Sequence, residues 1–436
     1  MKNIIASVMI SFKTLPVFLL LIIGNIDSIA QASTTTTKNA ALQISTFDMD
    51  VTPPIGYQMA FDPVVNNWDM GLRAKGIVLI GAGKPIVLLA VDWIGIYGKC
   101  HDEFRRALAA AAGTVPERVT VHTIHQHDAP RGLCDDDFVH AVIHRLEMAV
   151  IASLGHLTPI TEIGLGEAEV YEVASNRRIM GEISDTVSVM RWTSCTDPEL
   201  RAKPEGVIDP MVSLVSFWND EAPVAVLSFY ATHPQSYYRT GIPNPDFPGI
   251  ARFMRQLAVP GALHVHFTGA GGNIAAGKYN DGSQENRAIL AERLADGMKR
   301  AWEATQRFPV SNPDLKWEVE KVFLPCDSVR EMDEWIWVKQ LDIKDKQYDL
   351  QCLALKGTRI LFMPGELFVE YQLAAKSIRP DLFVAMAAYG DMGPRYIPTA
   401  KAFSRGGYEC SRSATKLLPG VESVIMNAMY KLLHDK

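Results

Sequence analysis

The stretch VTVHTIHQHDAP, residues 119–130, shows the pattern that decides how this chain folds. Residues 119–124 are mostly β-branched and apolar, which is typical of a strand. The run ends abruptly in the polar cluster 125–128, which contains His125 and His127. We therefore expect a buried strand that presents polar side chains at its carboxyl end.

The same pattern occurs four more times along the chain. Strand-forming runs at 224–230, 263–267, 359–363 and 382–388 end in polar or glycine-containing clusters at 232–235, 269–273, 364–366 and 390–393. Ligands of α/β proteins bind at the carboxyl ends of strands, where loops converge on one crevice. The five clusters are therefore the expected place of a binding or catalytic site.

Amphipathic helices are expected between these strands. Apolar residues recur at helical spacing in residues 102–112, 137–154 and 285–305, and again from about Glu366 onward. Strands that alternate with such helices predict an α/β fold, with a mixed β-sheet core flanked by helices.

The amino terminus reads as a signal peptide over residues 1–32. Lys2 provides the positive start, residues 15–23 form the apolar core, and Ala-Gln-Ala at 30–32 is a small-residue cleavage motif. The alternative is an uncleaved anchor, but the apolar run is well short of the roughly 20 residues that cross a bilayer. We expect an exported protein, periplasmic or secreted, without a stable transmembrane segment after cleavage.

Residues 33–45 are expected to form a polar tether, and residues 46–436 a single catalytic domain. The latter segment contains no Pro/Gly/Ser-rich linker, no charge run and no visible internal repeat. The net charge of −6 and a pI near 6.0, without a basic stripe, argue against nucleic acid as a partner. Six cysteines without a C-x-x-C pair exclude a structural zinc knuckle, and an exported location permits disulfides.

Most of the eleven histidines are expected to be packing residues. His140 and His144 have the spacing of a metalloprotease pair, but no glutamate follows the first of them. His264 and His266 point to one face of a strand and are expected to pack within the sheet.

His125, His233 and Glu366 form a more informative set. His125 shares a strand face with His127 if the strand continues that far. His233 and Glu366 each follow a different strand. Two histidines and a carboxylate, delivered to the same edge of a sheet, are the residue mix of a catalytic zinc site.

The chain resembles the neutral (non-lysosomal) ceramidase family from about Asp48 to about Glu409. Six short motifs occur in the family's order. They are DVTPPIG at 50–56, GLRAK at 71–75, HQHDAP at 125–130 (like H-T-H-[SA]-G-P), THP at 232–234, PGE at 364–366, and YIPT at 396–399 followed by Tyr408 and Glu409.

The resemblance implies one zinc ion bound by His125, His233, Glu366 and Tyr396. Zinc in such a site lowers the pKa of a water in its open position to about 7, so that the water can attack an amide or ester carbonyl.

Further roles follow from the same resemblance. His127 would polarise the carbonyl or shuttle a proton, and Tyr408 would donate to the oxyanion. The predicted substrate-binding residues are Asn176, Arg177, Arg178 and Asn273.

Four departures from the family bear on the substrate. Ala275 stands where the G-D-V-S-P-N motif has its serine, and Arg178 replaces the serine of N-R-S-P. Arg178 is either a surface residue or a partner for a carboxylate, sulfate or phosphate group. The segment 277–283 has no counterpart in the family and contains an Asn-Asp-Gly turn signal. The chain also lacks the family's additional C-terminal domain, so ceramide itself is not the expected substrate.

Three hypotheses follow. The first is a zinc-dependent hydrolase of an amide (N-acyl) bond in a lipid or an amino sugar. The second keeps the zinc but cleaves an ester, lactone or glycan bond, and is motivated by Arg177, Arg178 and the polar segment 277–283. The third, supported only by Ala275, is a non-catalytic binding protein on the same scaffold.

Overall fold

The computed structural model describes residues 41–81, 83–327 and 345–434. The predicted signal peptide and the first part of the predicted tether lie outside these residues. Residues 40–436 form one compact unit. The first strand, β1 (Gln43–Asp50), begins inside the predicted tether, and Leu42 and Ile44 are buried in the core. The predicted domain start at residue 46 is therefore a few residues too late, because these apolar side chains already pack.

One arrangement of strands and helices occurs three times in this unit. Each copy has three consecutive antiparallel strands, a helix, a fourth strand parallel to the third, and a second helix. The first copy is β1, β2 (Arg73–Ile80), β3 (Ile86–Val91), α1 (Gly98–Ala112), β5 (Val119–Thr123) and α2 (Asp137–Ser153). The second is β8 (Glu162–Glu169), β12 (Met211–Asn219), β13 (Ala222–Tyr230), α4 (Asp246–Ala258), β14 (Leu263–Thr268) and α5 (Glu285–Glu303). The third is β17 (Leu315–Phe323), β18 (Gln347–Leu355), β19 (Thr358–Phe362), α6 (Val369–Ile378), β21 (Phe383–Ala387) and α8 (Val421–Leu433). The fold therefore repeats a topology three times, although the sequence shows no visible internal repeat.

Short elements connect and extend these copies. Strands β7 (Thr158–Pro159) and β16 (Gln306–Pro309) extend the first and second sheets. Four two-stranded pairs lie outside them: β4 (Gly95–Ile96) with β6 (Arg131–Gly132), β9 (Ser175–Asn176) with β15 (Ile274–Ala275), β10 (Arg178–Met180) with β11 (Val187–Met190), and β20 (Glu366–Leu367) with β22 (Tyr396–Ile397). Among the described residues, the remaining helices are α3 (Pro198–Ala202), α7 (Ala400–Arg405) and the 3₁₀ helices Pro116–Arg118, Asn312–Asp314 and Tyr408–Cys410.

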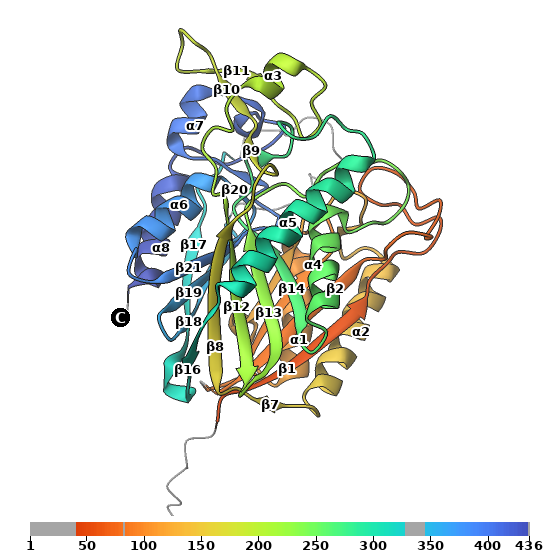
Figure 1. The fold of residues 1–436 in the computed structure, drawn as a ribbon, viewed down its shortest axis with the longest axis vertical. Helices are drawn as coiled ribbons and strands as arrows, with labels where there is room; N and C mark the ends of the chain where they lie inside the picture. The colour runs from red at the N-terminus through yellow and green to blue at the C-terminus, as the bar shows by residue number, and fades with distance from the viewer. Residues whose placement is uncertain (1–40, 82, 328–344, 435–436) are drawn as a thin grey trace, which may run out of the picture. The chain divides into compact units, whose positions relative to one another are not determined.

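Helices cover one face of each sheet, and the opposite faces of the three sheets meet in a shared core. Helices α4 and α5 lie on the second sheet, while α6 and α8 lie beside the third (Figure 1). Helices α1 and α2 pack on the first. The shared core is apolar and includes Leu88 of the first sheet, Phe267 of the second and Phe362 of the third. The α/β prediction of a mixed sheet core flanked by helices is confirmed.

The predicted helices correspond to α1, α2, α5 and α6, with differences at their starts. Helix α1 begins at Gly98 rather than at residue 102. Helix α6 begins at Val369, because Glu366 belongs to β20 and pairs with Tyr396. No helix in the described part of the chain is both long and apolar enough to span a membrane.

Strand β5, which precedes His125, ends earlier than the sequence predicts. Strand β5 stops at Thr123, and His125 adopts a left-handed backbone conformation with φ of 67°. The expectation that His125 and His127 share a strand face is therefore wrong, because the chain turns out of the sheet before it reaches them.

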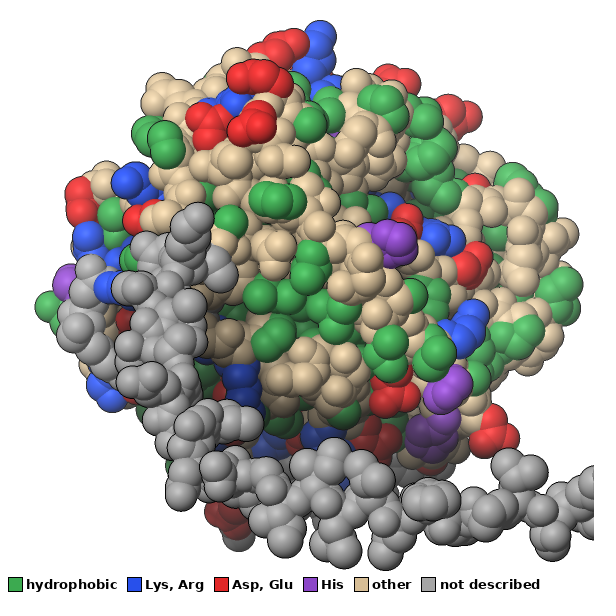
Figure 2. Space-filling model, turned by 90° about the horizontal axis from the view of Figure 1, so that it is seen from below, with side chains coloured by type: hydrophobic (Ala, Val, Ile, Leu, Met, Phe, Trp, Pro, Cys, Tyr) green, Lys and Arg blue, Asp and Glu red, His purple; other side chains and the backbone are tan. Residues whose placement is uncertain are grey.

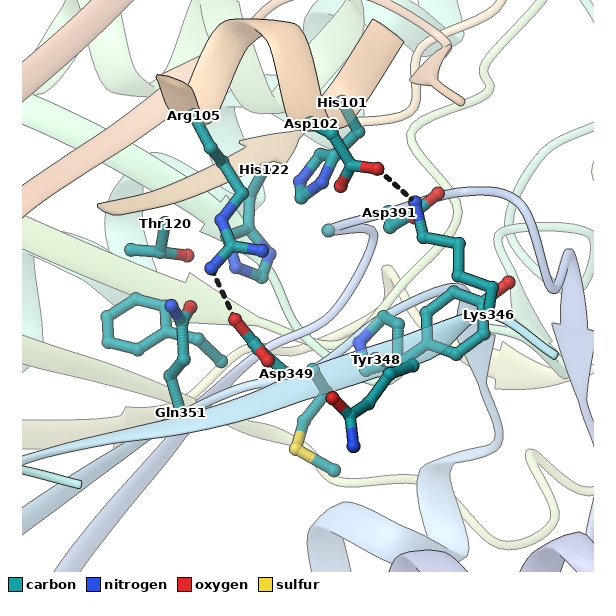
Figure 3. A pocket seen from close by; sticks show the side chains of 15 residues that line it. His101, Asp102, Arg105, Thr120, His122, Lys346, Tyr348, Asp349, Gln351 and Asp391 are labelled. Carbon is teal, nitrogen blue, oxygen red and sulfur yellow. Dashed lines mark hydrogen bonds and ion pairs between the residues drawn. The ribbon is translucent and has the colours of Figure 1, made fainter. Parts of the chain in front are cut away.

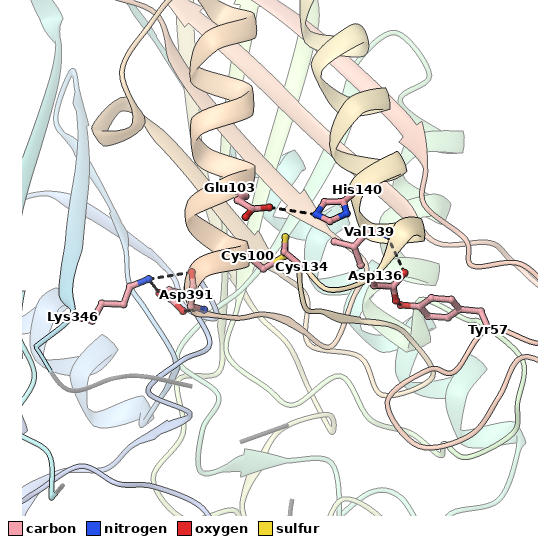
Figure 4. Close-up of a disulfide and its surroundings, with 10 residues drawn as sticks. Tyr57, Cys100, Glu103, Cys134, Asp136, Val139, His140, Lys346 and Asp391 are labelled. Carbon is pink, nitrogen blue, oxygen red and sulfur yellow. Dashed lines mark hydrogen bonds and ion pairs between the residues drawn. A yellow bond between two sulfur atoms is a disulfide. The ribbon is translucent and has the colours of Figure 1, made fainter. Parts of the chain in front are cut away.

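A disulfide joins Cys100, in the first turn of α1, to Cys134, just before α2 (Figure 4). It closes a segment that contains β5 and the cluster 125–128. The bridge therefore ties the two ends of the segment that carries His125 and His127.

The predicted site lies at one end of the sheets. Strands β9 and β20 lie above the sheets in Figure 1, whereas β7 and β16 lie at the lower end. Figure 2 shows this lower end, where hydrophobic side chains group near the middle of the face and charged side chains surround them. The predicted site residues lie in the upper part, near β9, β20 and β22.

Candidate metal centre

Each of the three structural copies contributes one side chain to a buried cluster. His125 follows β5, His233 follows β13, and Glu366 follows β19 and opens β20. These residues are only 4%, 1% and 5% exposed, and one donor atom of each lies within 4.8 Å of the other two. The structure therefore brings together three of the four metal ligands predicted from the sequence.

The imidazoles are oriented by the backbone. The Nδ1–H group of His125 donates to the Ile94 carbonyl at 2.5 Å, and that of His233 donates to the Gly271 carbonyl at 2.7 Å. A carbonyl can only accept, so Nδ1 of each ring carries a proton, and Nε2 is the ring nitrogen that faces the cluster. The Nε2 atoms of His125 and His233 lie 3.4 and 3.2 Å from Oε2 of Glu366.

Tyr396 is the fourth predicted ligand, and the structure places it beside the other three. Strand pairing sets Tyr396 opposite Glu366, and the Tyr396 hydroxyl lies 3.4 Å from Nε2 of His233. Burial is the main reason that the pKa of Tyr396 lies well above its ordinary value, while the guanidinium of Arg177 opposes this effect. Arg177 lies over the Tyr396 ring, with 5.1 Å between Cζ and the ring centroid.

The ionisation states suit a divalent cation. Burial alone would raise the pKa of Glu366, but His125 and His233 hold it well below its usual value, so the carboxylate is ionised. Burial lowers the pKa of His233 and keeps that imidazole neutral. Neutral imidazoles and a carboxylate are the forms in which these side chains bind metal. Two nitrogens and one or two oxygens fit zinc rather than calcium or magnesium, which take mainly oxygen ligands.

Strained backbone surrounds the cluster. Besides His125, the non-glycine residues Tyr389 and Arg395 have positive φ values, of 60° and 57°. Gly365, next to Glu366, has φ of 63°, and a Cβ there would lie 2.6 Å from the Arg395 carbonyl. Such conformations persist only where the surrounding structure enforces them, and they are concentrated at functional sites.

The two predicted catalytic residues lie at the edge of the cluster. The His127 ring is 4.9 Å from that of His125, and it packs against Phe61 at 5.9 Å and Tyr238 at 5.3 Å. Desolvation is the main cause that lowers the pKa of His127 well below its ordinary value, so this imidazole is neutral.

Tyr408 is partly exposed and lies farther from the cluster. Its ring is 5.7 Å from that of Tyr396 and 5.3 Å from that of Trp192. The catalytic roles of His127 and Tyr408 stay predictions.

The two arginines predicted to bind substrate share a buried partner. Arg177 Nε donates to Glu409 at 2.6 Å, and Arg178 Nη1 donates to the same carboxylate at 2.8 Å. Arg178 also donates to the carbonyls of Ala402 and Gly406. The Arg178 side chain is only 6% exposed, so it is not a surface arginine. Of the two, Arg177 reaches the cluster, through its contact with Tyr396.

The two predicted substrate-binding asparagines hold backbone segments. Asn176 donates to the Val207 carbonyl and accepts from the Arg178 amide. Asn273 accepts from the Val369 amide at the start of α6 and donates to Glu370, both at 2.9 Å. The structure thus gives the amide groups of both residues partners within the protein.

The departures from the ceramidase pattern are also located. Ala275 is fully buried in β15, where it pairs with Ser175. In the segment 277–283, Asn280 is fully buried and donates to the carbonyls of Thr193 and Ser236. This segment is therefore anchored in the fold, and only Asp281 and Ser283 are exposed.

Tyr389 is a residue of the cluster that the sequence analysis did not identify. Its ring stacks on that of His125, with 4.6 Å between centroids and 22° between planes, and it meets the ring of His233 edge-on at 6.1 Å. Burial is the main cause that raises its pKa well above the ordinary value. The signal was present, because Tyr389 lies between the strand run 382–388 and the cluster 390–393.

A second group of potential ligands lines a small cavity behind this site (Figure 3). Donor atoms of His101, Asp102 and Asp391 lie within 4.8 Å of one another. The Lys346 ammonium is 2.9 Å from Asp102 and 2.8 Å from Asp391, so the two carboxylates already have a cation (Figure 3). A third group contains Cys134, which is in the disulfide with Cys100 and has no free thiol (Figure 4).

Comparisons with known proteins bear on the fold. No family model and no curated protein matches the chain. The structure of neutral ceramidase from Pseudomonas aeruginosa matches with a TM-score of 0.69 and 14% identity, over 90% of this chain and 74% of that chain. A structure described as a ceramidase complexed with C2 matches with the same TM-score and identity, over 90% of this chain and 75% of that one. At this identity the likeness concerns the fold alone: the chain has the fold of the neutral ceramidase structure.

Proposed function

We propose that this protein is an exported zinc-dependent hydrolase that cleaves an amide (N-acyl) bond in a lipid or an amino sugar. The observation that carries the proposal is the convergence of His125, His233 and Glu366, with both Nδ1 atoms anchored to backbone carbonyls. Anchored imidazoles of this kind are typical of metal ligands, because the second hydrogen bond fixes the tautomer and the ring orientation.

Zinc bound by His125, His233, Glu366 and Tyr396 would supply Lewis-acid chemistry, which polarises a carbonyl and acidifies water. The protein's own groups then position the substrate and move protons. His127 is neutral, and within the described residues its Nδ1 atom is buried without a hydrogen-bond partner. It can therefore accept a proton from the attacking water and return it to the departing amine.

Two further side chains complete the proposed site. The Tyr408 ring lies 5.7 Å from that of Tyr396, and its hydroxyl would donate to the oxygen that gains charge during the reaction. The Arg177 guanidinium lies over the rings of Trp192 and Tyr396, with Cζ 5.7 and 5.1 Å from the two centroids, and would help to orient the substrate.

Export is supported by the amino-terminal sequence and by the disulfide between Cys100 and Cys134. Disulfides persist in oxidising compartments such as the periplasm and the extracellular space.

The choice of bond rests on the sequence resemblance and on the fold shared with structures described as ceramidases. Ceramide itself is not proposed, because Ala275 offers no hydroxyl. The grounds for an ester or glycan substrate are weaker in the structure, because Glu409 already pairs with Arg178 and because Asn280 is buried.

The test measures the amine that the mature protein, beginning at Ser33, releases from a panel of substrates. The panel contains N-acyl sphingolipids and N-acetylated, sulfated or uronic amino sugars, each assayed beside His125→Ala and a chelated control. Release of amine that requires both zinc and His125 is the expected result. Release of an alcohol or a reducing sugar without amine would replace the amide by another bond. A protein that binds a panel member without cleaving it would be a binding protein.

A further inference from the structure

Tyr389 occupies a position that packing alone does not explain. The residue is fully buried, and its ring lies flat against that of His125. A phenylalanine would make the same ring contacts. The tyrosine adds a hydroxyl group that, within the described residues, has no hydrogen-bond partner.

A buried hydroxyl without a partner is costly, because it has lost its hydrogen bonds to water. Such a group in a native structure needs an explanation, and a catalytic role or a bound water or ion is among the known ones. The Tyr389 ring contacts the rings of His125 and His233, with centroid distances of 4.6 and 6.1 Å. It is therefore in the candidate metal centre rather than in a remote part of the core.

The fold holds Tyr389 in place from both sides. Its amide donates to the Gly365 carbonyl, next to Glu366, and its carbonyl accepts from the amide of Thr123, at the end of β5. These bonds maintain a backbone with φ of 60°, which is unfavourable for a residue other than glycine.

The residues that follow reinforce this position. A Cβ at Gly390 would lie 2.9 Å from the Met363 carbonyl and 3.2 Å from the His122 ring, so the backbone there packs closely. Asp391 accepts from the amides of Gly98 and Gly393 and pairs with Lys346 (Figure 3). Strain that is enforced by so many contacts is typical of a functional residue.

We propose that Tyr389 is a further catalytic residue, whose hydroxyl donates a hydrogen bond to the oxygen of a ligand in the centre formed by His125, His233 and Glu366. This inference rests on the proposed function. The ligand oxygen belongs to a carbonyl, a carboxylate or a related oxyanion. A donor fixed in advance against a ligand histidine stabilises charge on that oxygen without rearrangement.

The test measures binding, so that it does not depend on knowledge of the substrate. Wild type, Tyr389→Phe and the control Tyr230→Phe are titrated calorimetrically, first with zinc and then, when loaded, with acetohydroxamate as the oxyanion probe. Tyr230 is also fully buried, but it belongs to the core beneath α4 and α5. Thermal unfolding of each metal-free variant verifies that it is folded.

The zinc affinity of Tyr389→Phe is expected to stay within about twofold of that of wild type. Its affinity for acetohydroxamate should fall about 10-fold or more, because a hydrogen bond to a charged group is lost. Tyr230→Phe should match wild type in both titrations. An unchanged hydroxamate affinity in Tyr389→Phe would show that the hydroxyl makes no such bond. A tenfold loss of zinc affinity would make Tyr389 a metal ligand instead. Wild type that binds no zinc would refute the proposed function and this inference with it, whereas either of the preceding results would refute this inference alone.

Discussion

The orientation of two imidazole rings determines what the centre can bind. His125 and His233 each donate from Nδ1 to a backbone carbonyl, so their tautomers depend on the path of the chain rather than on a replaceable side chain. Both Nε2 atoms consequently face Glu366. At this scale the chemistry depends on a few atoms whose positions the backbone fixes.

The carboxylate of Glu409 provides a test at the same scale. It is fully buried between Arg177 and Arg178, and Glu409→Gln would leave two buried guanidinium groups without their anion. We expect the free energy of unfolding at pH 7 to fall by about 3–5 kcal/mol. Urea denaturation of the two proteins measures the difference.

The pH dependence of that difference has a definite sign. Burial would raise the pKa of Glu409, but the two arginines outweigh it and hold the pKa below the reference value of 4.5. The carboxylate therefore contributes stability above about pH 4.5, and the contribution is lost as the pH falls through the pKa of the folded state. The difference in the free energy of unfolding between wild type and Glu409→Gln should therefore become smaller as the pH falls. A difference that stays constant down to pH 3 would contradict the assigned ion pairs.

Individual ligands were more predictable than the residues around them. His125, His233 and Glu366 follow strand-forming runs, and their chemistry distinguishes them from histidines on helices. Tyr389 also follows a strand-forming run, but tyrosine is common in strands and cores, and only its stacking on His125 sets it apart. The sequence does not show that Glu409 lies beside Arg178, so it left open whether Arg178 is a surface residue.

At the scale of elements, Glu366 depends on how α6 begins. Phe368, the residue that caps α6, has no oxygen in its side chain, and the amide of Val369 donates to Asn273 instead. Asn273→Ala removes this cap and is expected to cost about 1–2 kcal/mol of stability. Because Glu366 lies three residues before α6, zinc affinity should fall as well. Chemical denaturation and zinc titration measure the two effects, and Asn286→Ala near the start of α5 is the matched control. Loss of stability with unchanged zinc affinity would separate α6 from the metal centre.

The disulfide between Cys100 and Cys134 is a second element-scale test. It closes a loop of 34 residues, for which chain entropy predicts about 3–4 kcal/mol of stabilisation. The Cys100→Ser, Cys134→Ser double variant should lose about that much. Thermal unfolding with and without reductant measures it, and the reductant should leave the double variant unaffected. Equal melting of the oxidised wild type and the double variant would exclude a stabilising bridge.

Element types followed from residue patterns, but their ends did not. Strand β5 was predicted from its β-branched run, yet its end at Thr123 depends on a bond between the Thr123 amide and Tyr389. Likewise, Glu366 pairs with Tyr396, thirty residues later, rather than entering the helix. Such boundaries are decided by contacts between distant segments, which local periodicity does not report.

At the scale of the molecule, three similar units supply one residue each to the proposed metal centre. The units have different sequences, because the same topology needs only apolar strands and amphipathic helices, which many residues satisfy. The repeat was therefore invisible in the sequence and becomes clear only from the strand order. Their sheets share one apolar core, so no unit is expected to fold alone.

This arrangement predicts that metal binding stabilises the whole unit. In the proposed centre zinc would link His125, His233 and Glu366 across three units, so it should raise the melting temperature of one cooperative transition. At a free concentration 100 times the Kd, the gain is about 2.7 kcal/mol. Scanning calorimetry with zinc and with chelator measures the shift. If zinc raised the melting temperature of only one of several transitions, the three units would not unfold together through their shared core.

The most direct test of the account is the zinc content of purified variants. Wild type, His125→Ala, His233→Ala and Glu366→Ala are dialysed against zinc and analysed by elemental mass spectrometry, with His140→Ala on the surface of α2 as the control. Circular dichroism verifies that each variant is folded. We predict one zinc ion per chain in wild type and His140→Ala, and less than about a tenth of that in the other three variants, because each has lost one of its ligands. Full zinc occupancy in folded His125→Ala and His233→Ala would contradict the assigned centre.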